Sequence, residues 1–268
     1  MTQRSDRIYL AITYDQDWCH KSVLDWAVNL FLYEVSNKSV STNLTSRFPR
    51  FDSFDEPRLT VFVTDFSLEW FQSPLVEYGA HPNFEASTTQ GTSDRDILFR
   101  AENSIRDCST WRAHSLMSST RISELVTRTT SWTIENNYYL PNVTLLPYCI
   151  TNFPNHKPVL RVPLHWEDDL EMRSGRRAIE VLEEIPPMGN HLVVYNFHPI
   201  HLALNSVDMT LYENLKSANL LGKEISFYLE RASKQFGVRN QLLDLIRFIR
   251  NNICFKLISL NEVRGLIT

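Results

Sequence analysis

Short apolar runs alternate along the chain with helical patterns, and this alternation predicts an α/β protein. Apolar, β-branched runs bounded by polar or turn residues are typical of buried strands. The segments that fit are 8–14, 60–66, 77–80, 109–113, 134–140, 159–166, 192–197 and 255–260. Apolar positions at helical spacing lie between them, in 21–35, around 122–126 and in 240–251. Strands that alternate with helices favour a parallel sheet or barrel.

Two polar stretches interrupt this pattern. Residues 36–57 are rich in Ser, Thr and Asn and predict a long loop. Residues 86–94 follow a His-Pro-Asn sequence and predict a second loop, of a length that often serves as a lid or a binding segment. Because no shift in composition divides the chain, residues 1–268 are expected to form a single domain.

Composition and charge exclude several classes of protein. The formal net charge of −4 gives no electrostatic reason to expect binding to nucleic acid. The N-terminal segment lacks the apolar core of a signal peptide, and no run approaches the roughly 18 apolar residues of a membrane span. The chain is therefore expected to be cytoplasmic, with its four cysteines as free thiols. It also lacks the Gly-rich motifs that bind dinucleotides or nucleoside triphosphates.

Side chains that bind metals or transfer protons follow directly after several of the predicted strands. In barrel-like α/β folds the site is built at the C-terminal ends of the strands, so these side chains are expected to meet in one pocket. They are Asp15, Asp17, His81, Arg112, His114, Glu167, Asp168, His198 and His201. This pattern indicates an enzyme.

Asp15 and Asp17 are two residues apart at the end of a strand, so both are expected to point to one face if the strand continues. Two nearby carboxylates repel, and a cation or a proton has to neutralise one of them. A metal would do so, with one aspartate as its ligand and the other free as a base. The alternative is a solvated acidic turn.

Arg112 and His114 have the same spacing. A guanidinium group beside the paired aspartates would keep one of them ionised and oriented. An imidazole suits Zn²⁺, Fe, Ni or Co better than Mg²⁺. A surface arginine with a capping histidine is the alternative interpretation.

The last two polar clusters follow the predicted strands at 159–166 and 192–197. A histidine with a pKa near neutrality can protonate a leaving amine, but His198 and His201 could also bind a metal together, so their roles stay open. Trp166 could stack on a sugar ring. Glu167 or Asp168 could bind sugar hydroxyls or orient a catalytic side chain, unless they lie in a solvated acidic loop.

Taken together, the segments TYDQDW, GAHPNF, WRAHS, YYLPN, VPLHWEDD and NFHPIH resemble the polysaccharide deacetylase superfamily, carbohydrate esterase family 4 with the NodB homology domain. They are most similar to its WbmS-like subgroup, which is linked to lipopolysaccharide O-antigen synthesis. The resemblance spans roughly residues 8–205. It implies a distorted (β/α) barrel with seven or eight strands and a divalent metal at its mouth, zinc or else Ni, Co or Fe.

The resemblance also implies a ligand set for this metal. Asp17 and His81 match two of the family's ligands. Glu85 stands where the family has its second histidine, and His114 is the expected substitute for that histidine.

The same resemblance implies catalytic roles. Asp15 would be the general base, Arg112 the arginine that orients it, and His198 the general acid. The activity implied is metal-dependent hydrolysis of an N-acetyl group on an amino sugar of a surface-polysaccharide precursor. The expected substrate-binding residues are Trp166, Glu167, Asp168 and His201.

Three other functions are open on the sequence. A deformylase or another amidase of the same superfamily would use similar residues. A non-catalytic sugar-binding protein with a degenerate metal site would account for Glu85. A glycosidase is a weaker alternative, because its two carboxylates need a definite separation that the sequence does not supply. Oligomeric state is not indicated.

Overall fold

The computed structural model of the chain describes residues 7–17, 19–36, 58–67, 73–105, 107–144, 149–154, 156–186, 189–252 and 254–267. Apart from Ser36, the loop predicted at 36–57 lies outside these ranges. Among the described residues, no helix combines the length and the apolar character needed to cross a membrane.

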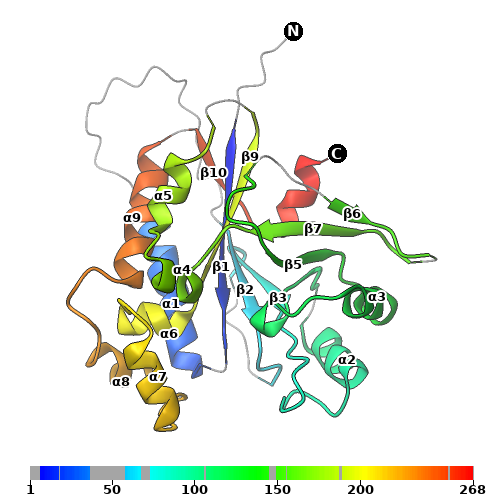
Figure 1. Cartoon of the computed structure of the whole chain (residues 1–268), viewed down its shortest axis with the longest axis horizontal. Helices are drawn as coiled ribbons and strands as arrows, with labels where there is room; N and C mark the ends of the chain where they lie inside the picture. The colour runs from blue at the N-terminus through cyan, green and yellow to red at the C-terminus, as the bar shows by residue number, and fades with distance from the viewer. Residues whose placement is uncertain are drawn as a thin grey trace.

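Strands run through the centre of the molecule and helices cover them on two sides (Figure 1). The strands are β1 (Ile8–Asp15), β2 (Leu59–Val63), β3 (Val76–Ala80), β4 (Thr110–Trp111), β5 (Ile134–Tyr139), β6 (Cys149–Thr151), β7 (Val159–Leu164), β8 (Trp166–Glu167), β9 (His191–Phe197) and β10 (Phe255–Leu257). The helices are α1 (Lys21–Ser36), α2 (Asp94–Ser104), α3 (Thr120–Thr129), α4 (Asp168–Ser174), α5 (Ala178–Glu183), α6 (Pro199–Leu204), α7 (Thr210–Ser217), α8 (Ile225–Leu229) and α9 (Val238–Asn251), with 3-10 turns η1 (His114–Leu116) and η2 (Asn261–Leu266).

All ten strands belong to one sheet, in the order β6-β7-β5-β4-β3-β2-β1-β9-β8, with β10 also paired to β1. Every ladder is parallel except that between β6 and β7. Only His165 separates β7 from β8, so one stretch of chain pairs with β5 on one side and with β9 on the other. The sheet therefore curves into a distorted barrel, although no described ladder joins its end strands β6 and β8. The predicted α/β class is confirmed.

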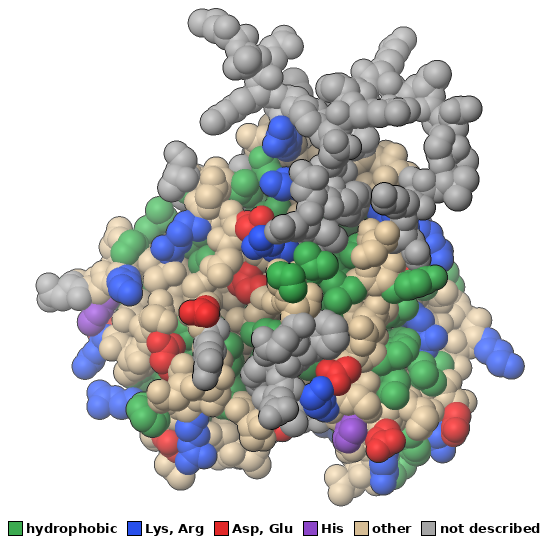
Figure 2. Space-filling model, turned by 180° about the vertical axis from the view of Figure 1, so that it is seen from behind, with side chains coloured by type: hydrophobic (Ala, Val, Ile, Leu, Met, Phe, Trp, Pro, Cys, Tyr) green, Lys and Arg blue, Asp and Glu red, His purple; other side chains and the backbone are tan. Residues whose placement is uncertain are grey.

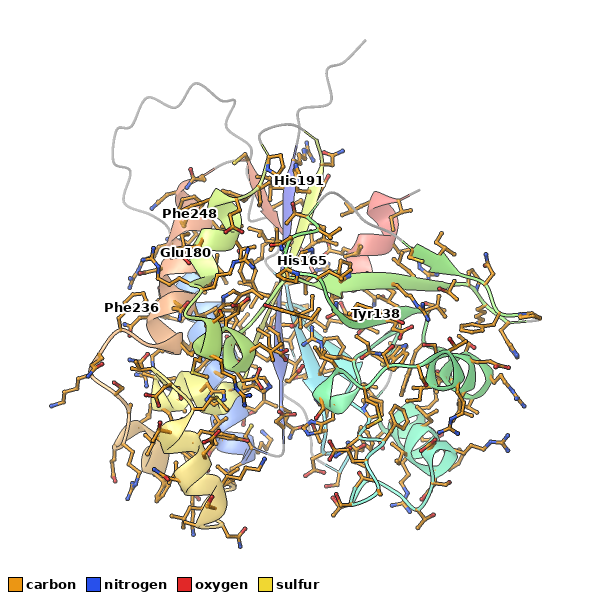
Figure 3. All side chains as sticks on the ribbon, in the orientation of Figure 1. Tyr138, His165, Glu180, His191, Phe236 and Phe248 are labelled. Atoms are coloured by element: carbon orange, nitrogen blue, oxygen red, sulfur yellow. The ribbon has the colours of Figure 1, made fainter. Side chains whose placement is uncertain are left out.

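The strands differ from the prediction in two places. β6 was not predicted, because Cys149–Thr151 is short and largely exposed. The predicted strand at 159–166 is divided at His165, whose Nδ1 accepts a hydrogen bond from the amide of Val194 at 2.9 Å. Its Nε2 donates to the carbonyl of Val143 at 2.7 Å. In this interruption of the ladder, which lies near the centre of Figure 3, an imidazole takes the place of a backbone acceptor.

The helices bury one face against the strands. In α1 the buried side chains follow helical spacing and include Val23, Ala27 and Phe31, and burial of a side chain such as Phe31 stabilises the fold by about 1.5–3 kcal/mol. α2 was missed in the sequence because only Ile97, Leu98 and Ala101 of its residues are buried. The hydroxyl of Ser93 caps this helix, which ends the loop predicted at 86–94.

Acidic and basic side chains are interspersed on the face seen in Figure 2, wherever described residues are visible there. On this face the described part of the chain presents no extended surface of one charge. This distribution agrees with the small formal net charge of −4.

Because the central strands are parallel, their C-terminal ends lie together at one end of the barrel. β1 ends at Asp15 and β8 at Glu167. His81, Arg112 and His198 are the first residues after β3, β4 and β9. The fold thus brings the predicted polar residues to one end of the sheet.

Candidate active site

Two donors hold the carboxylate of Asp15, which is only 2% exposed. Nη1 of Arg112 donates to its Oδ1 at 2.8 Å. Nδ2 of Asn196 donates to its Oδ2 at 2.9 Å. The predicted pairing of Arg112 with an aspartate is present, and Asp15 is that aspartate.

Arg112 is fully buried and is itself held in place. Its Nε donates to Oδ1 of Asn136 at 3.1 Å, and its Nη2 donates to Oγ1 of Thr13 at 3.0 Å. The guanidinium lies over the ring of Phe62, 4.3 Å from the centroid. Such a fixed guanidinium can orient Asp15 rather than merely neutralise it.

Asp17 reaches the site by a turn and not by continued strand geometry. β1 ends at Asp15, and Asp17 has the left-handed φ of 41°. Both aspartates face the same site, as expected. The expected cause, a strand that continues through Asp17, was wrong.

The carboxylate of Asp17 lies among three imidazoles. Its Oδ1 is 3.1 Å from Nε2 of His81 and 3.1 Å from Nδ1 of His114, and its Oδ2 is 3.2 Å from Nε2 of His198. Burial favours the neutral acid, but hydrogen bonds from these histidines outweigh it and hold the pKa of Asp17 well below its ordinary value.

His81 and His114 direct a ring nitrogen toward Asp17 from two different loops. Nδ1 of His81 lies 2.7 Å from the carbonyl oxygen of Arg112, so that Nε2 is the nitrogen left for a metal. His114 lies in η1, and its hydrogen bond to Asp17 is the main cause of its raised pKa. Glu85 accepts a hydrogen bond from the hydroxyl of Ser115 at 3.3 Å instead of facing Asp17.

The donor set fits a transition metal such as zinc. One ligand atom each from Asp17, His81 and His114 lies within 4.8 Å of the others, and imidazole with carboxylate is a ligand combination that zinc accepts. Two further groups of residues meet the same distance criterion: Asp15 with Glu167 and His198, and Asp168 with His198 and His201. Both contain His198, whose Nδ1 is bound to Asp168 at 2.6 Å. In the first group one ring nitrogen of His81 and one of His114 meet at the same oxygen, Oδ1 of Asp17, so this group is the strongest candidate.

His198 is tied to Asp168. Its Nδ1 lies 2.6 Å from Oδ1 of Asp168, and its backbone amide donates to Oδ2 at 2.8 Å. Burial alone would lower the pKa of His198, but the charge of Asp168 and the hydrogen bonds to Asp168 and Asp17 outweigh burial and raise it well above its ordinary value. His198 therefore favours the protonated form, with Nε2 directed at Asp17.

The predicted substrate-binding residues are mostly buried. Trp166 is fully buried and packs 4.9 Å from the ring of Phe197, so the prediction that it stacks on a sugar is wrong. Asp168 is fully buried, and both of its oxygens bond to His198 rather than to a ligand. His201 is 2% exposed, and burial lowers its pKa to about 4, so it too is packed rather than presented to a ligand.

Glu167 does face the site. Its Oε1 accepts a hydrogen bond from Nδ2 of Asn196 at 2.9 Å, and one of its carboxylate oxygens lies within 4.8 Å of Asp15 and His198. Burial, together with the charge of Asp169, raises the pKa of Glu167 to about 8. This carboxyl group therefore holds a proton more firmly than an ordinary glutamate does.

Thr13 and Asn196 were missed in the sequence. The sequence did place Asn196 two residues before His198, and alternate residues of a strand share a face, so this spacing could have indicated that Asn196 faces the site. Thr13 has the same relationship to Asp15. Neither residue type is a usual acid, base or metal ligand, which is why composition alone did not reveal them.

The structure resembles two solved ones. A protein from Bordetella bronchiseptica, described as a polysaccharide deacetylase involved in O-antigen biosynthesis, shares 22% identity over 90% of each chain with a TM-score of 0.66. The 4-alpha-glucanotransferase from Thermococcus litoralis shares 12% identity over 97% of this chain and 40% of that one, with a TM-score of 0.53. At these identities the two likenesses show the fold alone. No curated protein matches the sequence.

The family model of the WbmS-like polysaccharide deacetylases matches residues 12–216. The match covers most of the chain and includes every residue of the site described above. Enzymes of this kind are hydrolases that act on amide bonds. The chain therefore belongs to the WbmS-like family of polysaccharide deacetylases.

Proposed function

We propose that this protein is a metal-dependent deacetylase that hydrolyses an N-acetyl group of an amino sugar in a surface-polysaccharide precursor. The observation that carries the proposal is the position of Asp15, held by Arg112 and Asn196 beside the group formed by Asp17, His81 and His114. Family membership supports the reaction class. The description of the Bordetella protein supports the substrate class.

Asp17, His81 and His114 would hold the metal, which is expected to be zinc, with Ni, Co or Fe as alternatives. When bound, such an ion supplies a Lewis acid for the acetyl carbonyl and lowers the pKa of a water molecule. His114 takes the place of the histidine that Glu85 replaces. The site can thus have three protein ligands without a histidine at position 85.

Asp15 is the general base of the proposed reaction. It takes a proton from the attacking water, and the hydrogen bond from Arg112 holds its carboxylate in place for that step. Nδ2 of Asn196 donates a second hydrogen bond, to the other oxygen of this carboxylate. General bases of this kind contribute about 10²–10⁴-fold to a rate.

His198 is the general acid. It donates the proton on Nε2 to the amine that leaves when the tetrahedral intermediate collapses. Asp168 accepts the hydrogen bond from Nδ1 at 2.6 Å, which fixes the ring and favours the protonated imidazole. Asp15 is thus the base of the reaction and His198 is the acid.

The test begins with elemental analysis of the purified protein, followed by an assay of acetate release from N-acetylated amino sugars. We expect about one divalent metal per chain, and Asp15→Asn should abolish turnover while sparing metal binding. A fully active Asp15→Asn variant would reject the mechanism.

A parallel panel of N-formyl and simple amide substrates separates the deacetylase from a deformylase or another amidase. Tight binding of a glycan without turnover in any divalent metal would instead indicate a sugar-binding protein.

A further inference from the structure

Four side chains form a closed ring of hydrogen bonds around the carboxylate of Asp15. Arg112 donates through Nη1 to Asp15 Oδ1 at 2.8 Å and through Nη2 to Thr13 Oγ1 at 3.0 Å. The Thr13 hydroxyl lies 2.9 Å from Oδ1 of Asn196. Nδ2 of Asn196 closes the ring at 2.9 Å from Asp15 Oδ2. None of the four residues is more than 2% exposed.

The strand register creates this ring. Thr13 of β1 lies directly opposite Asn196 of β9, and Asp15 follows two residues later on the same face of β1. Arg112 enters from the end of β4, across β3 and β2. Three separate segments therefore have to be in register for both oxygens of Asp15 to be bound.

The amide of Asn196 has only one orientation that fits. Its Oδ1 faces the Thr13 hydroxyl, whose single proton is shared with the carbonyl of Tyr195 at 2.9 Å. Its Nδ2 donates to Asp15 and, at 2.9 Å, also to Glu167. A flipped amide would set its oxygen against Oδ2 of Asp15 and would lose the hydrogen bond to that carboxylate.

We propose that Asn196 is a positioning residue for Asp15, and that Thr13 holds Asn196 and Arg112 in place for this task. Without Asn196, no described residue donates a hydrogen bond to Oδ2 of Asp15, and Nε2 of His81 lies 3.9 Å from that oxygen. The carboxylate is then free to rotate out of line with the attacking water. Misplacement by about 1 Å can lower a rate by about 10²-fold. The assignment of Asp15 as the base rests on the proposed function.

Because Thr13 and Asn196 are fully buried, their loss should change kcat and leave KM unchanged. We expect Thr13→Val and Asn196→Ala to lower kcat by about 10–100-fold, with KM within about twofold and unchanged metal content. Thr13→Ser, which retains the hydroxyl, should restore most of the loss caused by Thr13→Val. The matched control is Thr60→Val, since Thr60 is equally buried and lies opposite Thr13 in β2, but its hydroxyl accepts from the amide of Leu260 and takes no part in the ring.

Crystal structures of the metal-loaded wild type and Asn196→Ala supply a readout that does not depend on activity. The variant should show the Asp15 carboxylate rotated or in two orientations. An unchanged Asp15 in that structure, or wild-type kcat in both variants, would overturn the proposal. So would an equal loss of kcat in Thr60→Val or a loss of metal, because either would assign the effect to general destabilisation. If the wild type releases no acetate, the proposed function fails, while the two structures still decide whether Asn196 positions Asp15.

Discussion

His81 and His114 lie edge to face, with ring centroids 5.5 Å apart and planes at 85°. His81 follows β3 and His114 follows β4, and these two strands are neighbours in the sheet. The amide of His114 donates to the carbonyl of Pro82 at 3.0 Å, which joins the two loops. The second histidine of the candidate metal site thus follows the adjacent strand β4. The family resemblance places this histidine at position 85, where this chain has Glu85.

This arrangement predicts that His81 and His114 are both needed for metal binding. Each of the variants His81→Ala and His114→Ala should lower the affinity for zinc by more than about 100-fold, since loss of even an outer contact to a ligand costs about 10–100-fold. Elemental analysis after dialysis and calorimetric titration with zinc measure the effect. His156→Ala is the control, because His156 precedes β7 and lies toward the opposite end of the parallel strands. Full metal content in His114→Ala would show that a different group of residues holds the ion.

A second prediction concerns the pair formed by His198 and Asp168. Asp168→Ala removes the acceptor of the 2.6 Å hydrogen bond and should lower kcat by about 10²-fold. Since the two residues act as one unit, His198→Ala should cost nearly as much alone as in the double variant. The test is a double-mutant cycle on kcat. Fully additive losses would show that Asp168 has a separate role.

Trp166 is expected to contribute to stability and not to sugar binding. Its ring is fully buried against the rings of Tyr195 and Phe197, and its Nε1 donates to the carbonyl of Arg176 at 3.1 Å. Trp166→Ala should lower the free energy of unfolding by about 3–5 kcal/mol. Phe236→Ala, at a ring that is 51% exposed, should lie within about 0.5 kcal/mol of the wild type. Denaturant titrations measure both, and a loss of glycan affinity without a loss of stability would restore the stacking role.

The stability of the fold should fall in mild acid because of His165. Burial is the main cause that lowers the pKa of His165 to about 4, from an ordinary value of 6.5. Between pH 6.5 and 4 the unfolded chain therefore binds a proton at His165 that the folded protein does not bind. The contribution of neutral His165 to the free energy of unfolding is complete above pH 6.5 and is lost as the pH falls toward 4. At pH 5 the loss is about 2 kcal/mol.

His165→Gln tests this expectation. The glutamine amide can accept from the amide of Val194 and donate to the carbonyl of Val143, as the imidazole does, but it does not titrate. The difference in the free energy of unfolding between pH 7 and pH 5 should shrink by about 2 kcal/mol in the variant. An unchanged difference would mean that His165 is not the group responsible.

The sequence by itself determined most of the strands and the end of the sheet at which the site lies. Apolar runs such as those in β1 and β9 have to be buried, and every parallel strand delivers the residue that follows it to the same end. Asp15, His81, Arg112 and His198 could therefore be predicted as neighbours although up to 183 residues separate them. The short motifs around them also carried the family resemblance that the family model bears out.

Only the tertiary structure decided which of these side chains touch. The left-handed turn at Asp17, the approach of His114 beside His81, and the inward direction of Trp166 depend on turn geometry and on the packing of separate segments. The ring through Asn196 needs the exact register of β1 against β9, and a slip of one residue would turn its side chain to the other face of the sheet. The local pattern of apolar and polar residues determines which segments form strands. Contacts of about 3 Å between distant residues depend on the register in which those strands align.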